Sequence, residues 1–206
     1  NQIPNLLREE LDIDKNSELL VKGSTGAGNI TLAPWIGLFD KRITSTAQEG
    51  YYVVFLFSLD LERLYLSLAF GATQFTRQYG ENKLARSKMQ EASDKIRKLF
   101  PVPPETKLVS EQPDLHGLVK RKSKTHQEYE ASCIFSLPAY TLTDLPTEGE
   151  LIDDIRCVRN IYSDLIESPM VPEVVKLLED SIERIDEESI TFDVSDFLPV
   201  ERKKQK

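Results

Sequence analysis

The stretch that decides the fold is residues 20–72, which read LVKGSTGAGNITLAPWIGLFDKRITSTAQEGYYVVFLFSLDLERLYLSLAFGA. Within it, Tyr51–Ser58 is a continuous apolar segment rich in β-branched and aromatic residues, which predicts a strand. Leu64–Phe70 alternates between larger and smaller side chains, and only residues 59–63 separate it from the first segment. A connection of that length is typical of a hairpin, so the two strands are predicted to pair as antiparallel neighbours.

The same stretch also carries features that suit a binding surface. Several glycines in residues 23–28 let the backbone turn sharply and approach another molecule closely. Trp35, the only tryptophan, follows Pro34 and provides a flat, rigid platform. This layout favours the binding of a flat ligand, for which a nucleobase is one candidate.

Outside this stretch, the patterns predict flanking helices and a few further strands. Apolar periodicity predicts a helix over 82–100, and Thr147 with Glu150 forms a capping-box pattern that starts a second helix over 147–166. Shorter helices are predicted over 5–14 and 172–185, and further strands over 18–22, 30–38 and 129–136. The expected fold is α+β, a curved mixed β-sheet flanked by helices.

The motifs in these strands resemble a known family. The runs KGSTGAGN, APWIGLFD, ITSTAQEGYYVVFLFS and LYLSLAFG, in this order from residue 22 to 71, are similar to the N-terminal DNA-binding domain of McrB, the specificity subunit of a modified-cytosine restriction system. A weaker similarity comes from Cys133, Tyr140 and the run LPTEGELIDDIRCVRNIY, which resembles the last helix of that domain. Together the resemblance covers residues 18–167.

The resemblance implies that the domain recognises a modified base in duplex DNA, flipped from the stack into a pocket. The pocket residues carried over are Trp35, Tyr52, Leu56 and, less directly, Tyr129. The implied DNA-binding residues are Lys22, Ser24, Thr25, Gly26, Ala27, Asn29, Lys41, Arg42, Thr44 and Ser45. One family member has a tyrosine where this chain has Ala27, and that tyrosine fills the gap left by the flipped base. Arg42 is our candidate for this task here.

The resemblance also predicts the organisation of the chain. We expect an N-terminal helical segment over 1–17, the DNA-binding domain over 18–167, and an acidic helical extension with a basic linker tail over 168–206. The domain is expected to bind DNA without catalysis and to serve an effector nuclease or GTPase of a restriction system that defends against foreign DNA. Position 1 is not Met, which indicates a piece of a longer protein.

The charge distribution agrees with this assignment, although a net charge of −8 taken alone opposes DNA binding. Residues 20–126 carry 16 basic and 10 acidic side chains, a balance of +6. Residues 127–198 carry 4 and 18, a balance of −14. Phosphate binding depends on local basic surface, and the basic section is the one with the family motifs. The alternative is an ordinary solvated surface beside an acidic helical tail.

Composition predicts an intracellular protein. No run of eighteen apolar residues spans a membrane, and no basic segment precedes an apolar one as in a signal peptide. The two cysteines, Cys133 and Cys157, fit free thiols in a reducing cytoplasm.

Other motifs have simpler explanations than catalysis. The glycine turn lacks the Lys-Ser/Thr of a phosphate-binding P-loop. His116 and His126 lack metal-ligand spacing, so no metal or cofactor is expected. The pairs Asp153-Asp154 and Glu179-Asp180 fit solvated helix faces, and the basic run 120–124 is either surface or a track for phosphates. A rival function is a protein-interaction scaffold that docks through the acidic helices of 147–188 and has no DNA role.

Overall fold

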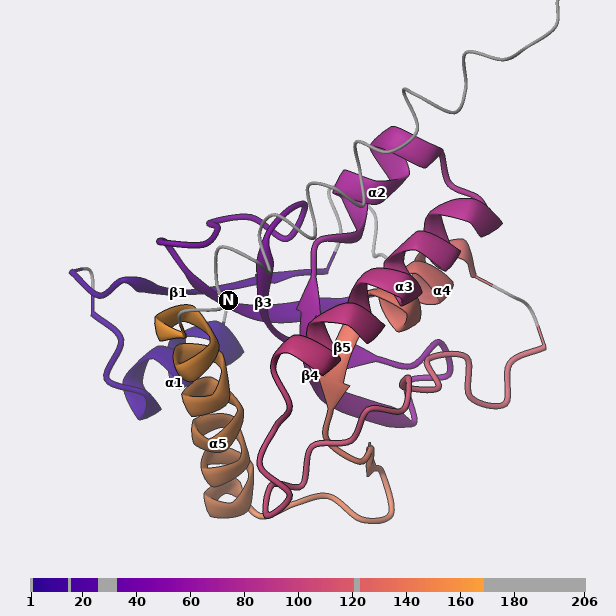
Figure 1. Ribbon diagram of the computed structural model, residues 1–206. Coiled ribbons are helices and arrows are strands. Elements are labelled where there is room, and N and C mark those ends of the chain that lie inside the picture. The colour runs from indigo at the N-terminus through magenta and orange to yellow at the C-terminus, as the bar shows by residue number, and fades with distance from the viewer. Residues whose placement is uncertain (1, 15, 26–32, 121–122, 169–206) are drawn as a thin grey trace, which may run out of the picture.

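The computed structural model describes residues 2–14, 16–25, 33–120 and 123–168 (Figure 1). These residues form an open β-sheet with helices on both sides, which confirms the α+β class and the curved, helix-flanked sheet. The helices are α1 (Gln2–Glu10), α2 (Ala72–Tyr79), α3 (Lys83–Leu99), α4 (Lys124–Ser132) and α5 (Glu148–Glu167). The strands are β1 (Leu19–Ser24), β2 (Trp35–Asp40), β3 (Tyr51–Phe57), β4 (Arg63–Phe70), β5 (Cys133–Ser136) and β6 (Tyr140–Thr141).

The sheet has the strand order β1-β2-β3-β4-β5, and the short β6 also pairs with β4. Every pairing among the described strands is antiparallel, which corrects the mixed sheet that the sequence predicts. The physical reason is connectivity: short links between β1, β2, β3 and β4 reverse the chain, whereas parallel neighbours need a long crossover. The predicted hairpin is confirmed, with Tyr51 opposite Phe70 and Phe57 opposite Leu64.

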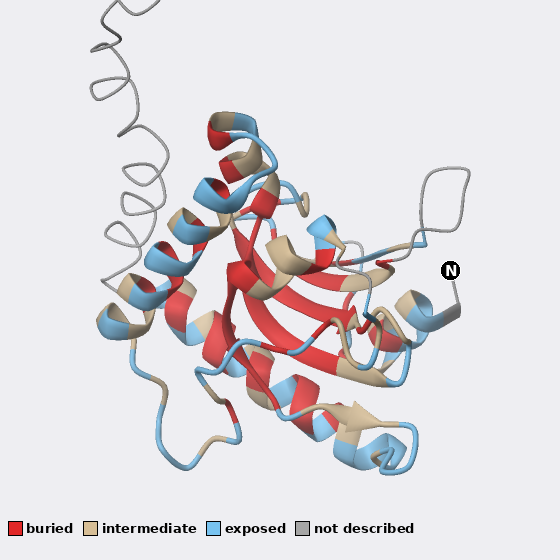
Figure 2. Ribbon diagram, turned by 90° about the vertical axis from the view of Figure 1, so that its right-hand side faces the viewer, coloured by how far each residue is buried: buried red, intermediate tan, exposed pale blue. Residues whose placement is uncertain are grey.

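The central strand β3 is buried on both faces, which explains why its sequence is apolar throughout. Tyr51, Val53 and Phe55 belong to the main core, which also receives side chains from α1, α2, α3 and α5. The alternate side chains Tyr52, Val54 and Leu56 belong to a second, smaller cluster on the other face. Figure 2 shows the buried strands enclosed between helices in this way. The second cluster is the one that contains the candidate site.

The two long helices form where the sequence predicts them. Asn82 caps α3 by accepting hydrogen bonds from the backbone of Leu84 and Ala85. The predicted capping box of Thr147 and Glu150 starts α5. Near the N-terminus, α1 lies a few residues earlier than predicted, because Asp12 takes a left-handed φ of 53° that no helix continues through.

Two elements differ from the sequence-based expectation. Residues 129–132, predicted as the start of a strand, complete α4, so that β5 is limited to Cys133–Ser136. The helix has a start signal in Ser123, whose hydroxyl accepts a hydrogen bond from the backbone of His126. Helix α2 was not predicted, because its N-cap is Gly71, which offers no capping side chain. Its buried Phe75 and Tyr79 lie one turn apart and hold it against the core.

One tyrosine of α5 anchors that helix to the sheet. The hydroxyl of Tyr162 accepts a hydrogen bond from the backbone N–H of Asp40 at 3.0 Å and donates one to the carbonyl of Tyr51 at 3.0 Å.

Tyr162→Phe leaves both buried backbone groups without this partner, so we expect a loss of about 1–3 kcal/mol in the free energy of unfolding. Urea titration measures it. Tyr51→Phe is the control, because the buried Tyr51 hydroxyl has no hydrogen-bond partner among the described residues and its removal should cost less; equal losses would contradict the anchor role.

In the described part of the chain, no helix is long and apolar enough to cross a membrane.

Candidate nucleic-acid interface

The four predicted pocket residues line one hollow on the second face of the sheet. Trp35 comes from β2, Tyr52 and Leu56 from β3, and Tyr129 from α4, which crosses this face. The rest of the lining is Ala47, Val54, Ala69 and Ser132. Residues from five separate parts of the chain therefore converge on a lining that is aromatic and aliphatic apart from the hydroxyl groups of Tyr52, Tyr129 and Ser132.

Strand register places the sheet residues of this hollow. Trp35 lies directly opposite Leu56, and Ala69 lies directly opposite Tyr52. Since side chains alternate between the two faces of a strand, Trp35 and Phe39, four residues apart on β2, lie on the same face. The three aromatic rings form a chain: the centroids of Trp35 and Phe39 are 6.1 Å apart, and those of Phe39 and Tyr52 are 4.8 Å apart.

Gly37 makes this aromatic chain possible. A Cβ atom at Gly37 would lie 2.5 Å from Cζ of the Phe39 ring, which occupies the space that a side chain would take. The Phe39 ring is completely buried, so it forms a fixed support beside Tyr52 and beneath Trp35. Sequence reasoning missed Phe39, although strict alternation from Trp35 through Gly37 was a signal that could have found it.

The loop 41–50 closes the hollow on one side. The hydroxyl of Tyr52 donates a hydrogen bond to the carbonyl of Ala47 at 2.9 Å. Burial raises the pKa of Tyr52, so the phenol keeps its proton and remains a donor. The free space inside is about 10 Å³, enough for one water molecule. In this closed form the hollow is too small for a base, and entry requires Trp35 or the loop to move.

The predicted phosphate contacts of loop 41–50 have mixed surroundings. Lys22 is exposed on β1, and its Nζ donates to the carbonyl of Ser45 at 2.5 Å, which ties the strand to the loop. Lys41 donates to the carbonyl of Ser17 at 2.6 Å. Thr44 is buried, and its hydroxyl bonds with the backbone of Thr46 within the loop. Lys22, Lys41 and Ser45 are thus open to solvent, whereas Thr44 shapes the loop.

Arg42 is held on the opposite side of the sheet from the hollow. Its guanidinium forms two hydrogen bonds with the carboxylate of Asp40, at 3.0 and 2.8 Å. Burial acts to raise the pKa of Asp40, but the hydrogen bonds from Arg42 outweigh it and hold the pKa below its ordinary value. Asp40 lies next to Tyr162 of α5, and Glu167 is another charge near Arg42. An approach of Arg42 to DNA requires the loss of this ion pair.

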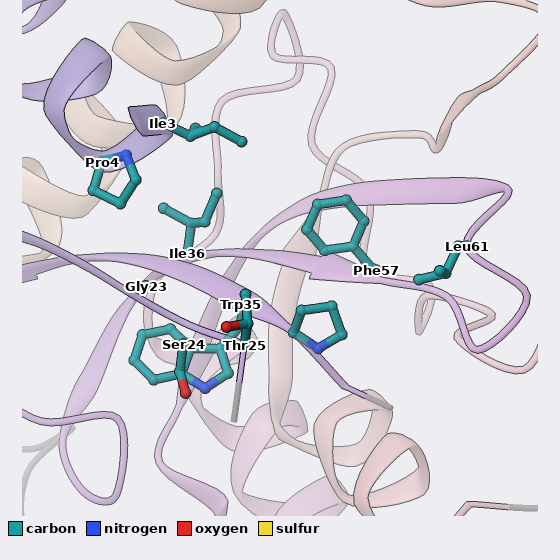
Figure 3. Close-up of a pocket in the computed structure, with 10 residues that line it drawn as sticks. Ile3, Pro4, Gly23, Ser24, Thr25, Trp35, Ile36, Phe57 and Leu61 are labelled. Carbon is teal, nitrogen blue, oxygen red and sulfur yellow. The ribbon is translucent and has the colours of Figure 1, made fainter. Parts of the chain in front are cut away.

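The glycine turn is described only at its start. Ser24 ends β1, and Thr25 is exposed beyond it; Gly26, Ala27 and Asn29 lie outside the described residues. Beside this point an apolar groove of about 630 Å³ runs along the main-core face. In Figure 3, Ile36 and Phe57 point to the same side of the strands as Ile3 and Pro4 of α1. Nothing in the described residues identifies what covers this groove.

No group of three or more His, Cys, Asp or Glu side chains that could hold a metal ion occurs in the residues that the structure describes. Both histidines serve instead to hold the segment before α4. His116 Nε2 accepts a hydrogen bond from the backbone N–H of Ser123 at 3.1 Å, and Nδ1 bonds with Glu130 at 2.9 Å. His126 Nδ1 bonds with the Ser123 hydroxyl at 2.8 Å.

These features agree with a comparison against protein families. The model of the MrcB-like N-terminal domain family matches residues 1–167, which include the whole sheet and α5. The chain belongs to this family, as the resemblance to the McrB N-terminal domain indicated. Membership supports DNA recognition as its general role, in a binding domain of a restriction system that works with effector modules. No curated protein matches the chain.

Proposed function

We propose that this domain reads a modified base in duplex DNA by flipping it, and gives that specificity to a restriction effector outside the chain. The observation that carries the proposal is the convergence of Trp35, Tyr52, Leu56 and Tyr129 on one hollow. Flat aromatic walls suit a nucleobase, because stacking on an aromatic ring is worth about 1–3 kcal/mol per base.

The chemistry of the hollow favours a pyrimidine with a small apolar substituent. Leu56, Val54 and Ala69 offer aliphatic contact, and a single methyl group in such a site is worth about 1–3 kcal/mol. That alone gives modest discrimination, so hydrogen bonds to the base edge are also needed. When loop 41–50 moves, the Tyr52 hydroxyl and the Ala47 carbonyl lose each other as partners, and both become available to the base.

Phosphate contacts set the register of the duplex in this proposal. Lys22, Lys41 and Ser45 are exposed; Lys41 lies beside the start of β1, and Lys22 bonds to loop 41–50. Ser24 and Thr25 lie at the other end of β1. Such contacts position the DNA and carry no sequence information. In this proposal residues 18–167 form the reading domain; the predicted helix over 172–185 and the predicted basic linker tail lie outside the described residues. Cys133 and Cys157 are free thiols, as in proteins of a reducing cytoplasm.

A panel of duplexes tests the proposal. Three duplexes share one sequence and carry cytosine, 5-methylcytosine or 5-hydroxymethylcytosine at a single position. A second pair of duplexes carries adenine or N6-methyladenine at that position. We expect tighter binding to one modified duplex and a rise in 2-aminopurine fluorescence beside that position. Equal affinity for modified and unmodified duplexes would reject base reading. Absence of DNA binding at low salt would instead favour the protein-interaction scaffold.

A further inference from the structure

Most basic side chains of the described residues are already engaged within the protein. Lys22 and Lys41 donate to backbone carbonyls, Arg42 is paired with a carboxylate, and ion pairs hold most of the others. Only a few basic side chains of the described residues form neither a hydrogen bond nor an ion pair with another described residue: those of Lys83, Arg86, Lys98, Lys120 and Lys124. Three of these five, Lys83, Arg86 and Lys124, lie on the first half of α3 or at the start of α4.

A polar groove lies between these two helices. Lys83, Arg86, Ser87 and Gln90 of α3 line one side, and Gln127 and Glu130 of α4 line the other, with Gln112 between them. Its volume is about 390 Å³. The groove presents ammonium, guanidinium and amide N–H donors, which are the groups that bind phosphate oxygens.

Among the described residues, the carboxylates near the groove form no ion pair with Lys83, Arg86 or Lys124. Glu130 accepts a hydrogen bond from the backbone N–H of Leu115 at 2.8 Å and bonds with His116 at 2.9 Å. Because His116 Nε2 accepts from Ser123, its Nδ1 carries the proton and donates to Glu130. Burial raises the pKa of Glu128, against the influence of Arg86 and Lys124. Those two cations therefore lie near the same carboxyl group, and Glu81 is a further acidic neighbour.

Helix α4 separates the groove from the base hollow. Tyr129 and Ser132 line the hollow, whereas Gln127 and Glu130 line the groove. Residues three apart lie on the same face of a helix, so Tyr129 with Ser132 marks one face of α4 and Gln127 with Glu130 marks another. A helix is about 10–12 Å across, and successive nucleotides of one strand are about 3.4 Å apart along the duplex axis. A DNA strand with a base in the hollow would thus bring phosphates about three nucleotides away to the groove.

We propose that Lys83, Arg86 and Lys124 form a second phosphate-binding surface that holds the DNA backbone beside the flipped base, on the far side of α4. This inference rests on the proposed function for its position relative to the base. It assigns the DNA contact to a surface outside the family motifs of residues 22–71, and it gives the basic run 120–124 a role through Lys124.

The test uses the full 206-residue chain. One variant combines Lys83→Gln, Arg86→Gln and Lys124→Gln. A control with the same loss of charge combines Lys98→Gln, Arg156→Gln and Arg159→Gln. Lys98 lies at the far end of α3, about 20 Å from Lys83 at 1.5 Å per residue, and the two arginines lie on α5. Binding to a modified and an unmodified duplex is measured from 50 to 200 mM salt.

We expect the groove variant to bind both duplexes at least about tenfold more weakly at low salt, and its slope of log K against log salt to fall by about 2–3 relative to wild type. Its preference for the modified duplex should persist. The control should match wild type. If the groove variant and the control behave alike, the inference is overturned. If wild type has no preference for modification but the groove variant still loses affinity and slope, base reading fails while this phosphate surface stands.

A phosphate scan locates the contact independently. Single phosphates of the duplex are replaced with uncharged methylphosphonates at one to five nucleotides from the modified base. We expect wild type to lose affinity for replacements about three nucleotides away, and the groove variant to be insensitive to those same replacements. Equal sensitivity of both proteins at every position would also overturn the inference.

Discussion

Replacement of Trp35 with alanine is expected to weaken binding to the modified duplex by about 1–3 kcal/mol, or about 5- to 150-fold, and to remove most of the preference for modification. Trp35 is half-buried at the start of β2 and lines the hollow, and Phe39 is the one aromatic ring that it contacts among the described residues. Its exposed face is therefore available to a base. Fluorescence of 2-aminopurine beside the modified position, together with affinity, measures the loss of the flipped state.

The fold should tolerate this change better than the loss of a core residue. A fully buried aromatic residue costs about 3–5 kcal/mol when it is replaced with alanine, and Phe39→Ala is the matched control of that kind. Trp35→Phe keeps a flat ring and should retain part of the affinity. If Trp35→Ala unfolds as readily as Phe39→Ala while its folded fraction binds modified DNA normally, Trp35 is a core residue and the base binds elsewhere.

The sheet and the composition of the hollow could be predicted because they depend on local patterns. Tyr51–Ser58 and Leu64–Phe70 carry strong strand propensity and a short link, so their pairing follows directly. Period-two alternation places Tyr52 and Leu56 on one face whatever the rest of the chain does. The family motifs then point to that face as the one with the candidate site.

Other features depend on contacts between distant segments and could not be predicted. Tyr129 was expected in a strand, but α4 brings it over the sheet, because Ser123 starts a helix that the polar sequence hardly signals. The sequence predicts Arg42 as a DNA contact, yet in the structure Arg42 forms an ion pair with the buried Asp40. The closure of the hollow arises from the bond between Tyr52 and Ala47 across the loop. None of these pairings has a sequence signature.

The conformation of loop 41–50 also depends on a glycine outside it. Gly71 is buried directly after β4, and its N–H donates to the carbonyl of Gly50 at 2.8 Å. A Cβ atom at Gly71 would lie 2.3 Å from the backbone carbon of Gln48 and 2.3 Å from the backbone nitrogen of Glu49. Backbone atoms have no alternative rotamer to adopt, so the loop itself would have to move away.

Gly71→Ala should therefore destabilise the protein by about 1–3 kcal/mol and also weaken DNA binding, because the displaced loop carries Ala47 of the hollow and the phosphate contacts of Lys41 and Ser45. Urea unfolding and the duplex panel measure the two effects. Gly149→Ala is the control: its Cβ has no neighbour within 4 Å, and alanine in helix α5 should stabilise by up to about 1 kcal/mol without effect on binding. Weaker binding at unchanged stability would mean that the loop is loosely held and moves without cost to the fold. If stability and affinity are both unchanged, the close approach of loop 41–50 to Gly71 determines neither the position of the loop nor the shape of the hollow.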